Sequence, residues 1–190
     1  MTLEYTLDID YAVWMPVPLE FPWNGYDTAM SWAADVTDDL LAGRDAPEEV
    51  RRAFAATALE RALMPSPLDE AIERFWRRPD AGAPDRLVHL YALEVDGVPD
   101  ADEFAELART GFGGFVQNVT PLEGTPFAVA ARVMILLKLP GGATATLMRV
   151  IGVRDGTALM LELLDDNIAS VAFLEPDVEV LFRGIRLRTA

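Results

Sequence analysis

The side chain best suited to acid–base chemistry in this sequence is His89, the only histidine among the 190 residues. It alternates with Leu87 and Tyr91, so the sequence predicts that the imidazole lies on the same face of a strand as these two side chains. The chain offers no cysteine nucleophile and no serine within a Gly-x-Ser-x-Gly turn. We therefore name no catalytic residue and predict that the protein is not an enzyme.

Clustered acidic residues are the second group that could do chemistry. Asp35, Asp38 and Asp39 lie in one predicted helix, and the segment 165–167 reads Asp-Asp-Asn. Oxygen atoms of this kind bind hard cations, but neither group has the spacing of an EF-hand loop. One histidine and no cysteine leave few ligands for zinc. Solvated acids and a turn are the favoured interpretation, and we predict no metal site.

The stretch from Thr110 to Gly114 is the one glycine cluster that could act as a phosphate-binding loop. Its glycines lack the dinucleotide-binding spacing, and no Lys-Ser or Lys-Thr pair follows them. The cluster also comes after a predicted helix instead of opening one. A helix-to-strand turn is therefore the favoured interpretation, and no cofactor is predicted.

Aromatic residues in the first 76 positions are the candidate binding residues. All four tryptophans lie there, three of them close to a proline-rich stretch over residues 14–23. Tryptophan and tyrosine are favoured where an apolar body needs one polar tip, as in partner surfaces and ligand pockets. The alternative is that these side chains dock the arm and the helices on a sheet. The candidates are Trp14, Trp23, Tyr26, Trp32 and Trp76.

A net charge of −15, from 31 acidic and 16 basic residues, limits the partners of the chain. No segment concentrates basic residues, so we predict no binding of nucleic acid or of a membrane surface. A basic protein partner is compatible with this charge, and so is plain solubility. No apolar run approaches the roughly 20 residues of a membrane span and no leader is recognisable, so a cytoplasmic location is expected. Arginine used almost without lysine, with abundant alanine, is typical of high-GC bacteria such as actinobacteria.

The first half of the chain is predicted to contain a strand, an extended arm and helices. Residues 3–13 alternate between apolar and polar side chains, as in a half-buried strand, and the prolines of the following stretch predict an extended arm. Helical spacing of apolar residues then predicts helices over 28–41, from Pro47 to residue 63, and over 68–77. They would form a helical insertion or subdomain over residues 26–80 that covers one face of the sheet.

The second half is predicted to be dominated by strands. Residues 127–164 alternate with period two and contain the turn signals Pro140-Gly141-Gly142 and Asp155-Gly156, which predicts a three-stranded meander with one buried and one partly wet face. The other predicted elements are a strand over 87–95, a helix from Asp100 to Arg109, a strand over 115–120, a helix over 177–183 with Pro176 in its first turn, and an extended piece over 185–187.

This order of elements resembles that of PsbP-like proteins, including a terminal helix within Pro176 to Ile185 (PDVEVLFRGI). The resemblance covers the second half of the chain. It implies an α/β/α sandwich, with an antiparallel sheet flanked by helices, in a binding or accessory protein. We predict an α+β fold with five to seven antiparallel strands, in a single domain over residues 1–190.

For function, these patterns favour a non-enzymatic protein-interaction or accessory module in a bacterium. The alternative is a carrier for a small apolar ligand held between sheet and helices, near Trp32 and Trp76. A hydrolase with an unrecognised pair of carboxylates is a weaker third hypothesis. A homodimer through an open sheet edge is compatible with each of these, because an antiparallel sheet leaves two edges.

Overall fold

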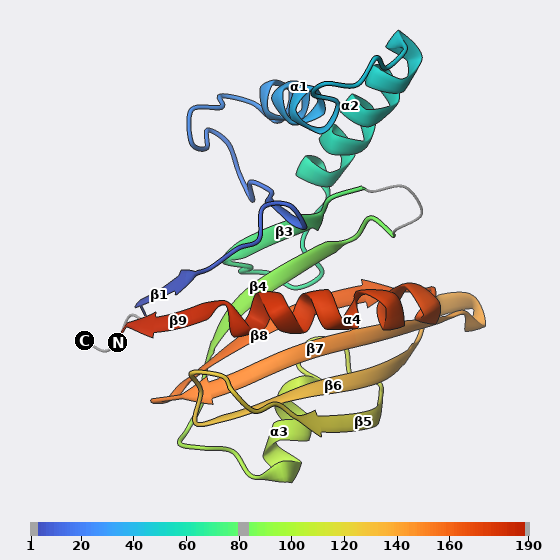
Figure 1. The fold of residues 1–190 in the computed structure, drawn as a ribbon. Helices are drawn as coiled ribbons and strands as arrows, with labels where there is room; N and C mark the ends of the chain where they lie inside the picture. The colour runs from blue at the N-terminus through green and yellow to red at the C-terminus, as the bar shows by residue number, and fades with distance from the viewer. Residues whose placement is uncertain (1–3, 80–83, 189–190) are drawn as a thin grey trace.

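A computed structural model describes residues 4–79 and 84–188 of the chain. The fold is α+β, as predicted, with a seven-stranded antiparallel sheet in the order β2-β3-β4-β8-β7-β6-β5 and a two-stranded β1–β9 sheet (Figure 1). The strands are β1 Glu4–Leu7, β2 Trp14–Pro16, β3 Glu73–Arg77, β4 Leu87–Glu94, β5 Phe115–Pro121, β6 Val129–Lys138, β7 Thr144–Arg154, β8 Thr157–Asp165 and β9 Ile185–Arg188. The helices of the described residues are α1 Ala29–Leu40, α2 Glu48–Leu63, α3 Ala101–Ala108 and α4 Ile168–Arg183, with a short 3-10 turn at Pro140–Gly142.

The predicted meander is present as β6, β7 and β8, but the prediction of a partly wet face is wrong for its centre. Every residue of β7 from Ala145 to Val153 is buried. Met148 and Val150 belong to the core on the α4 side, whereas Leu147 and Ile151 belong to the core on the α3 side. The central strands are buried on both faces because a helix packs on each side of the sheet.

Helix α4 covers one face, and it is longer than the predicted terminal helix. It begins at Ile168, where the Asn167 side chain caps it by accepting a hydrogen bond of 3.0 Å from the backbone N–H of Ala169. Pro176 lies in the helix interior, so its assignment to a first turn is wrong. The proline removes one helical hydrogen bond, which the burial of an apolar stripe along the whole helix offsets. That stripe consists of Val171, Leu174, Val178, Leu181 and Phe182.

Helix α3 lies against the opposite face, and its predicted start is confirmed. The Asp100 carboxylate accepts hydrogen bonds of 2.9 Å from the backbone N–H groups of Asp102 and Glu103, and the Glu103 carboxylate accepts one from the N–H of Asp100. This reciprocal cap fixes where the helix begins. Phe104 and Ala108 then pack on the sheet.

Helices α1 and α2 pack together at the β2–β3 end of the sheet instead of over the meander (Figure 1). The third predicted helix, over 68–77, is wrong, because residues 73–77 form strand β3. Phe75 and Trp76 are both buried, but Phe75 contacts the α4-side core and Trp76 the core of the helix pair. Neighbouring side chains of a strand point to opposite faces, which suits this pair of large apolar residues.

The amino-terminal segment is divided where one strand was predicted. Strand β1 pairs with β9, and the chain then turns at Asp10, whose carboxylate accepts a hydrogen bond from the N–H of Ala12. Strand β2 takes up the start of the proline-rich arm and pairs with β3 at the edge of the sheet, where Pro16 is tolerated. None of the described helices is both long and apolar enough to span a membrane.

Candidate binding site

Three of the five aromatic candidates lie in the core. Trp14, Trp32 and Trp76 are 2%, 2% and 0% exposed. Trp14 packs in the core beneath α4, whereas Trp32 and Trp76 pack between the helix pair and the sheet edge. The burial of their large apolar surfaces accounts for aromatic residues at these three positions. Their side chains pack the arm and the helices against the sheet.

Trp23 and Tyr26 are half-buried and lie together in the turn before α1. Their rings stack with centroids 6.4 Å apart, and a pair of backbone hydrogen bonds joins the two residues. The Tyr26 hydroxyl donates a hydrogen bond to Asp35 on α1, which raises its pKa. Both side chains pack against the core of the helix pair. The structure thus brings four of the candidates around one core and places Trp14 in another.

The acidic candidates have protein partners. On α1, Asp38 and Asp39 pair with Arg51 and Arg78 at 3.1 and 3.0 Å. At the end of β8, Asp165 pairs with Arg86. No group of three or more metal-ligating side chains occurs in residues 4–79 and 84–188.

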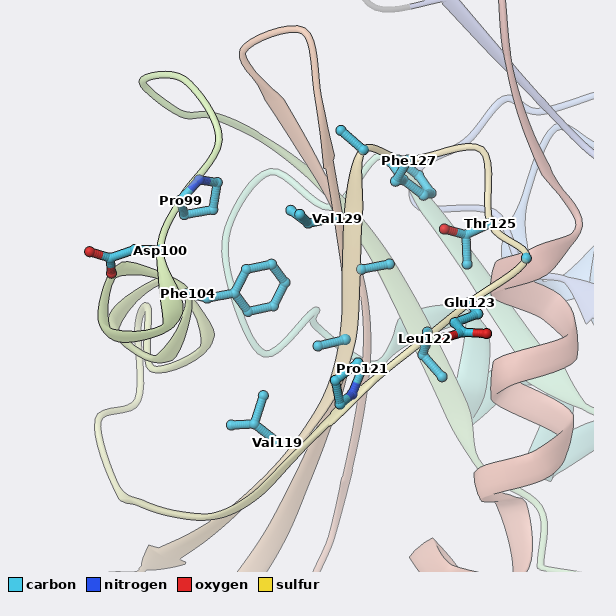
Figure 2. A pocket seen from close by; sticks show the side chains of 14 residues that line it. Pro99, Asp100, Phe104, Val119, Pro121, Leu122, Glu123, Thr125, Phe127 and Val129 are labelled. Atoms are coloured by element: carbon cyan, nitrogen blue, oxygen red, sulfur yellow. The ribbon is translucent and has the colours of Figure 1, made fainter.

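A candidate ligand site is a hollow of about 540 Å³ that borders α3, the end of β5 and the start of β6, here called the α3 pocket. In Figure 2, Phe104 points from α3 across the space toward Val129, and Val119 points into it from β5. Leu122 and Phe127 also border the hollow, but they lie on the other side of β6, in the core beneath α4. A space of this size and character is typical of sites that hold an apolar group.

One glycine shapes the surroundings of the α3 pocket, and a second shapes the far end of β5. Gly152 leaves room for the Phe127 ring, since a Cβ atom on residue 152 would lie only 2.3 Å from Cγ of Phe127. The Phe127 ring in turn stacks on Phe182 of α4, with centroids 5.0 Å apart. Gly114 has a positive φ of 91° where the chain enters β5, close under Leu137 and Ile135. The predicted helix-to-strand turn is confirmed here.

The rim of the α3 pocket is acidic. Asp100 lines it directly, and Asp102 and Glu103 are exposed on the adjoining first turn of α3. Glu123 is exposed on the other side of β6, where Arg183 donates a hydrogen bond to its backbone carbonyl. The exposed carboxylates on the first turn of α3 favour a ligand or partner with basic groups around an apolar centre.

Strand β5 ends the seven-stranded sheet beside this pocket. Only β6 pairs with it among the described strands, so its outer backbone groups face away from the sheet. Its sequence, FVQNVTP, carries no charge, although charged residues commonly protect such an edge. Phe115 and Val119 are exposed on it, and a bulge falls between Val116 and Asn118. The opposite edge, β2, is only three residues long, and each edge strand ends in a proline, Pro16 in β2 and Pro121 in β5.

Pairing across β5 and β6 shows which side chains share the pocket face. Val119 and Pro121 lie opposite Val133 and Ala131, which belong to the α3-side core. Sequence reasoning identified the strand and the helix separately but missed this site. The residues around the pocket come from segments on either side of residues 105–118, so they are not adjacent in the sequence. The apolar residues of the 121–129 turn were the one feature of the sequence that could have indicated the site.

Comparison with known proteins adds no family and no function. No family model matches the chain, and no curated protein matches it. A solved structure from Pseudomonas aeruginosa, described as a protein of unknown function and putative regulator, has 17% identity and a TM-score of 0.47, covering 67% of this chain and 90% of that one. A structure from Bacteroides thetaiotaomicron has 12% identity and a TM-score of 0.39, covering 64% of this chain and 41% of that one. Likenesses this distant carry no functional argument.

Proposed function

We propose that this chain is a non-enzymatic interaction module that binds an extended segment of a partner protein along β5. The observation that carries the proposal is an uncharged outer strand lying beside an apolar pocket. Peptides that add a strand to a sheet edge gain affinity from main-chain hydrogen bonds and specificity from pockets for alternate side chains. Strand β5 and the α3 pocket supply both parts.

The chemistry of the partner follows from the pocket and its rim. Because Val119 and Pro121 point to the α3 face, alternate side chains of an added strand would point to that face too. One apolar side chain would enter the α3 pocket, and basic neighbours would approach the exposed carboxylates of Asp102 and Glu103 on the first turn of α3. Lys138 lies over Phe115 at the far end of β5, so basic residues are favoured at the pocket end only.

The test is selection of binders from a random dodecapeptide library displayed on phage. We expect enrichment of extended sequences with an apolar residue flanked by Lys or Arg. A selected peptide, labelled with fluorescein, should lose about tenfold or more affinity for the variant Val119→Lys, because the substitution removes apolar contact and repels basic residues. Val119 is 42% exposed, so the variant should fold.

The matched control is Val50→Lys, which places the same change at a residue 38% exposed on the first turn of α2. It should leave peptide affinity within about twofold, as for a surface change away from the contact. Selected peptides without apolar–basic character, or equal binding by both variants, would overturn the proposal.

A carrier function is the second candidate, because the volume and apolar lining of the α3 pocket also fit a small ligand. The site differs from the space near Trp32 and Trp76, which are packed in the core. Native mass spectrometry separates the occupants. A co-purified polypeptide supports the interaction module, whereas an added mass of a few hundred daltons favours the carrier. A dimer that Val119→Lys dissociates would identify a second copy as the occupant and overturn the proposed partner.

A further inference from the structure

Helix α4 lies on one face of the sheet (Figure 1), and a second apolar stripe runs along its outward side. Helical spacing places five residues there, opposite the stripe that packs on the sheet. All five are exposed, and Phe173 and Val180 are 54% and 64% exposed. A helix that is apolar on two opposite sides is expected to be covered on both. We call the five residues the outer stripe: Ala169, Ala172, Phe173, Pro176 and Val180.

The acidic residues of α4 lie on its flanks and pair with arginines of the sheet. Arg132 of β6 donates to Glu175 and, at 2.6 Å, to Glu179. Arg77 of β3 donates to Asp177 at 2.9 Å. These pairs hold the helix on the sheet and leave the outer stripe uncharged. Covering the outer stripe therefore removes apolar surface from water without burying an unpaired charge.

The outer stripe is complementary to itself when two copies of α4 pack antiparallel. With the two-fold axis at the level of residues 174–175, Phe173 of each copy lies opposite Pro176 of the other, and Ala169 lies opposite Val180. Each contact then occurs twice, and a larger side chain meets a smaller or flatter one. Small residues such as alanine also let two helices approach closely, within the usual axial separation of about 8–10 Å.

The charges at the ends of α4 fit the same register. Asp166 is exposed just before the helix. Arg183 lies in the last turn with its side chain 37% exposed, and it uses one terminal nitrogen to pair with Glu179 at 3.0 Å. The axis at residues 174–175 sets Asp166 of each copy opposite Arg183 of the other. A parallel arrangement would instead bring like charges together at both ends, which is unfavourable.

We propose that two copies of this chain form a dimer in which the outer stripes pack together with their α4 helices antiparallel. A membrane surface fits the outer stripe less well, because a net charge of −15 repels anionic lipids. Helix α3 lies on the opposite face of the sheet, so this interface is separate from the α3 pocket. The inference does not depend on the β5 proposal.

Sedimentation velocity of the purified chain tests for this dimer. We expect a dimer at about 100 µM protein, because a contact between two helices is small and of moderate affinity. Val180→Lys should raise the dissociation constant of the dimer about tenfold or more, since it places unpaired charges within the apolar contact. Val180 is 64% exposed, so the variant should fold, and circular dichroism checks this.

The matched control is Val98→Lys, which makes the same change at a residue 58% exposed in the link between β4 and α3. It should leave the dissociation constant within about twofold, as for a surface change away from the contact. Val119→Lys on β5 should do the same, which separates this dimer from binding along the sheet edge.

A charge exchange tests the antiparallel register. Asp166→Arg sets arginine opposite Arg183 in its own dimer, and Arg183→Asp sets aspartate opposite Asp166, so each variant alone should dimerise more weakly than the wild-type chain. In an equimolar mixture, both end contacts of the mixed dimer pair opposite charges again. We expect the mixture to contain more dimer than either variant at the same total concentration.

A wild-type chain that stays monomeric at this concentration would overturn the proposal in favour of a different protein as the occupant of the outer stripe. A dimer that Val180→Lys leaves intact, or that Val119→Lys dissociates, would place the contact elsewhere and contradict it too. A mixture with no more dimer than the single variants would exclude the antiparallel register. The first outcome is read on the wild-type chain, so it stands even if a variant fails to fold.

Discussion

His89 and Tyr91 point into the same buried space, and burial moves both away from their charged forms. The pKa of His89 falls to about 3, whereas the pKa of Tyr91 rises through burial and through the nearby Glu162 carboxylate. Arg74, on the neighbouring strand, also has a lowered pKa because it is buried. Polar side chains here thus act as hydrogen-bonding groups within the sheet, and the Arg149–Glu162 pair is the one fully buried ion pair in the described part of the chain.

The pH dependence of stability gives a test at this scale. The folded pKa of His89, about 3, lies below the ordinary histidine pKa of 6.5, so near pH 5 the unfolded chain binds a proton that the folded chain excludes. Above pH 6.5 the titration of His89 does not change the free energy of unfolding. As the pH falls from 6.5 toward 3, it lowers this free energy by about 1.4 kcal/mol per pH unit. Arg74 and Glu162 flank the ring, and both residues are retained in the variant His89→Phe, so the comparison isolates the imidazole.

His89→Phe should therefore lose about 2 kcal/mol less stability than the wild-type protein between pH 7 and pH 5. Urea unfolding at both pH values measures this, and the carboxylates titrate equally in the two proteins. An equal loss in the free energy of unfolding for the wild-type protein and the variant would show that His89 is protonated in the folded state at pH 5.

At the scale of elements, local patterns predicted the sheet better than they predicted its packing. The alternation of residues 127–164 and the Asp100 cap define elements by themselves, and the structure has them. Residues 73–77 were misassigned because Phe75 and Trp76 form a strand only through their neighbours on β2 and β4. The buried polar residues Arg74, His89, Glu162 and Arg149 lie side by side on neighbouring strands. This arrangement could not be predicted either, because it depends on the register between strands far apart in the sequence.

The packing of Phe127 on Gly152 is a test at the same scale. A methyl group in Gly152→Ala would enter the space of the ring and force it away from Phe182. We expect a loss of about 1–3 kcal/mol in the free energy of unfolding, as for other overpacked cores. Urea denaturation measures it.

A double-mutant cycle with Phe127→Leu supplies the control for this prediction. Since leucine leaves room for the added methyl group, the two substitutions together should be less damaging than their sum. Additive effects would show that Gly152 matters for its backbone and not for the ring.

At the scale of the whole molecule, the three buried cores differ in how well they are enclosed. Strands β7 and β8 lie between two cores, one beneath α4 and one beneath α3. The core of the helix pair instead lies at the β2–β3 end, and α2 buries only Ala58 and Ala62 fully (Figure 1). Residues held by few buried apolar contacts open at lower free energy than the rest of a fold.

That residues 26–80 form a separate subdomain stays a prediction. Hydrogen–deuterium exchange tests it, by asking whether the less enclosed core of the helix pair opens independently of the sheet. Amides of α1 and α2 should exchange together and at least about tenfold faster than those of β7 and β8, through an opening that leaves the sheet intact. Trp32→Ala, which opens a cavity in the helix-pair core, should speed exchange in α1 and α2 while β7 and β8 change little. If exchange instead rises equally in both regions, the helix pair and the sheet unfold as one cooperative unit, and residues 26–80 are not a separate subdomain.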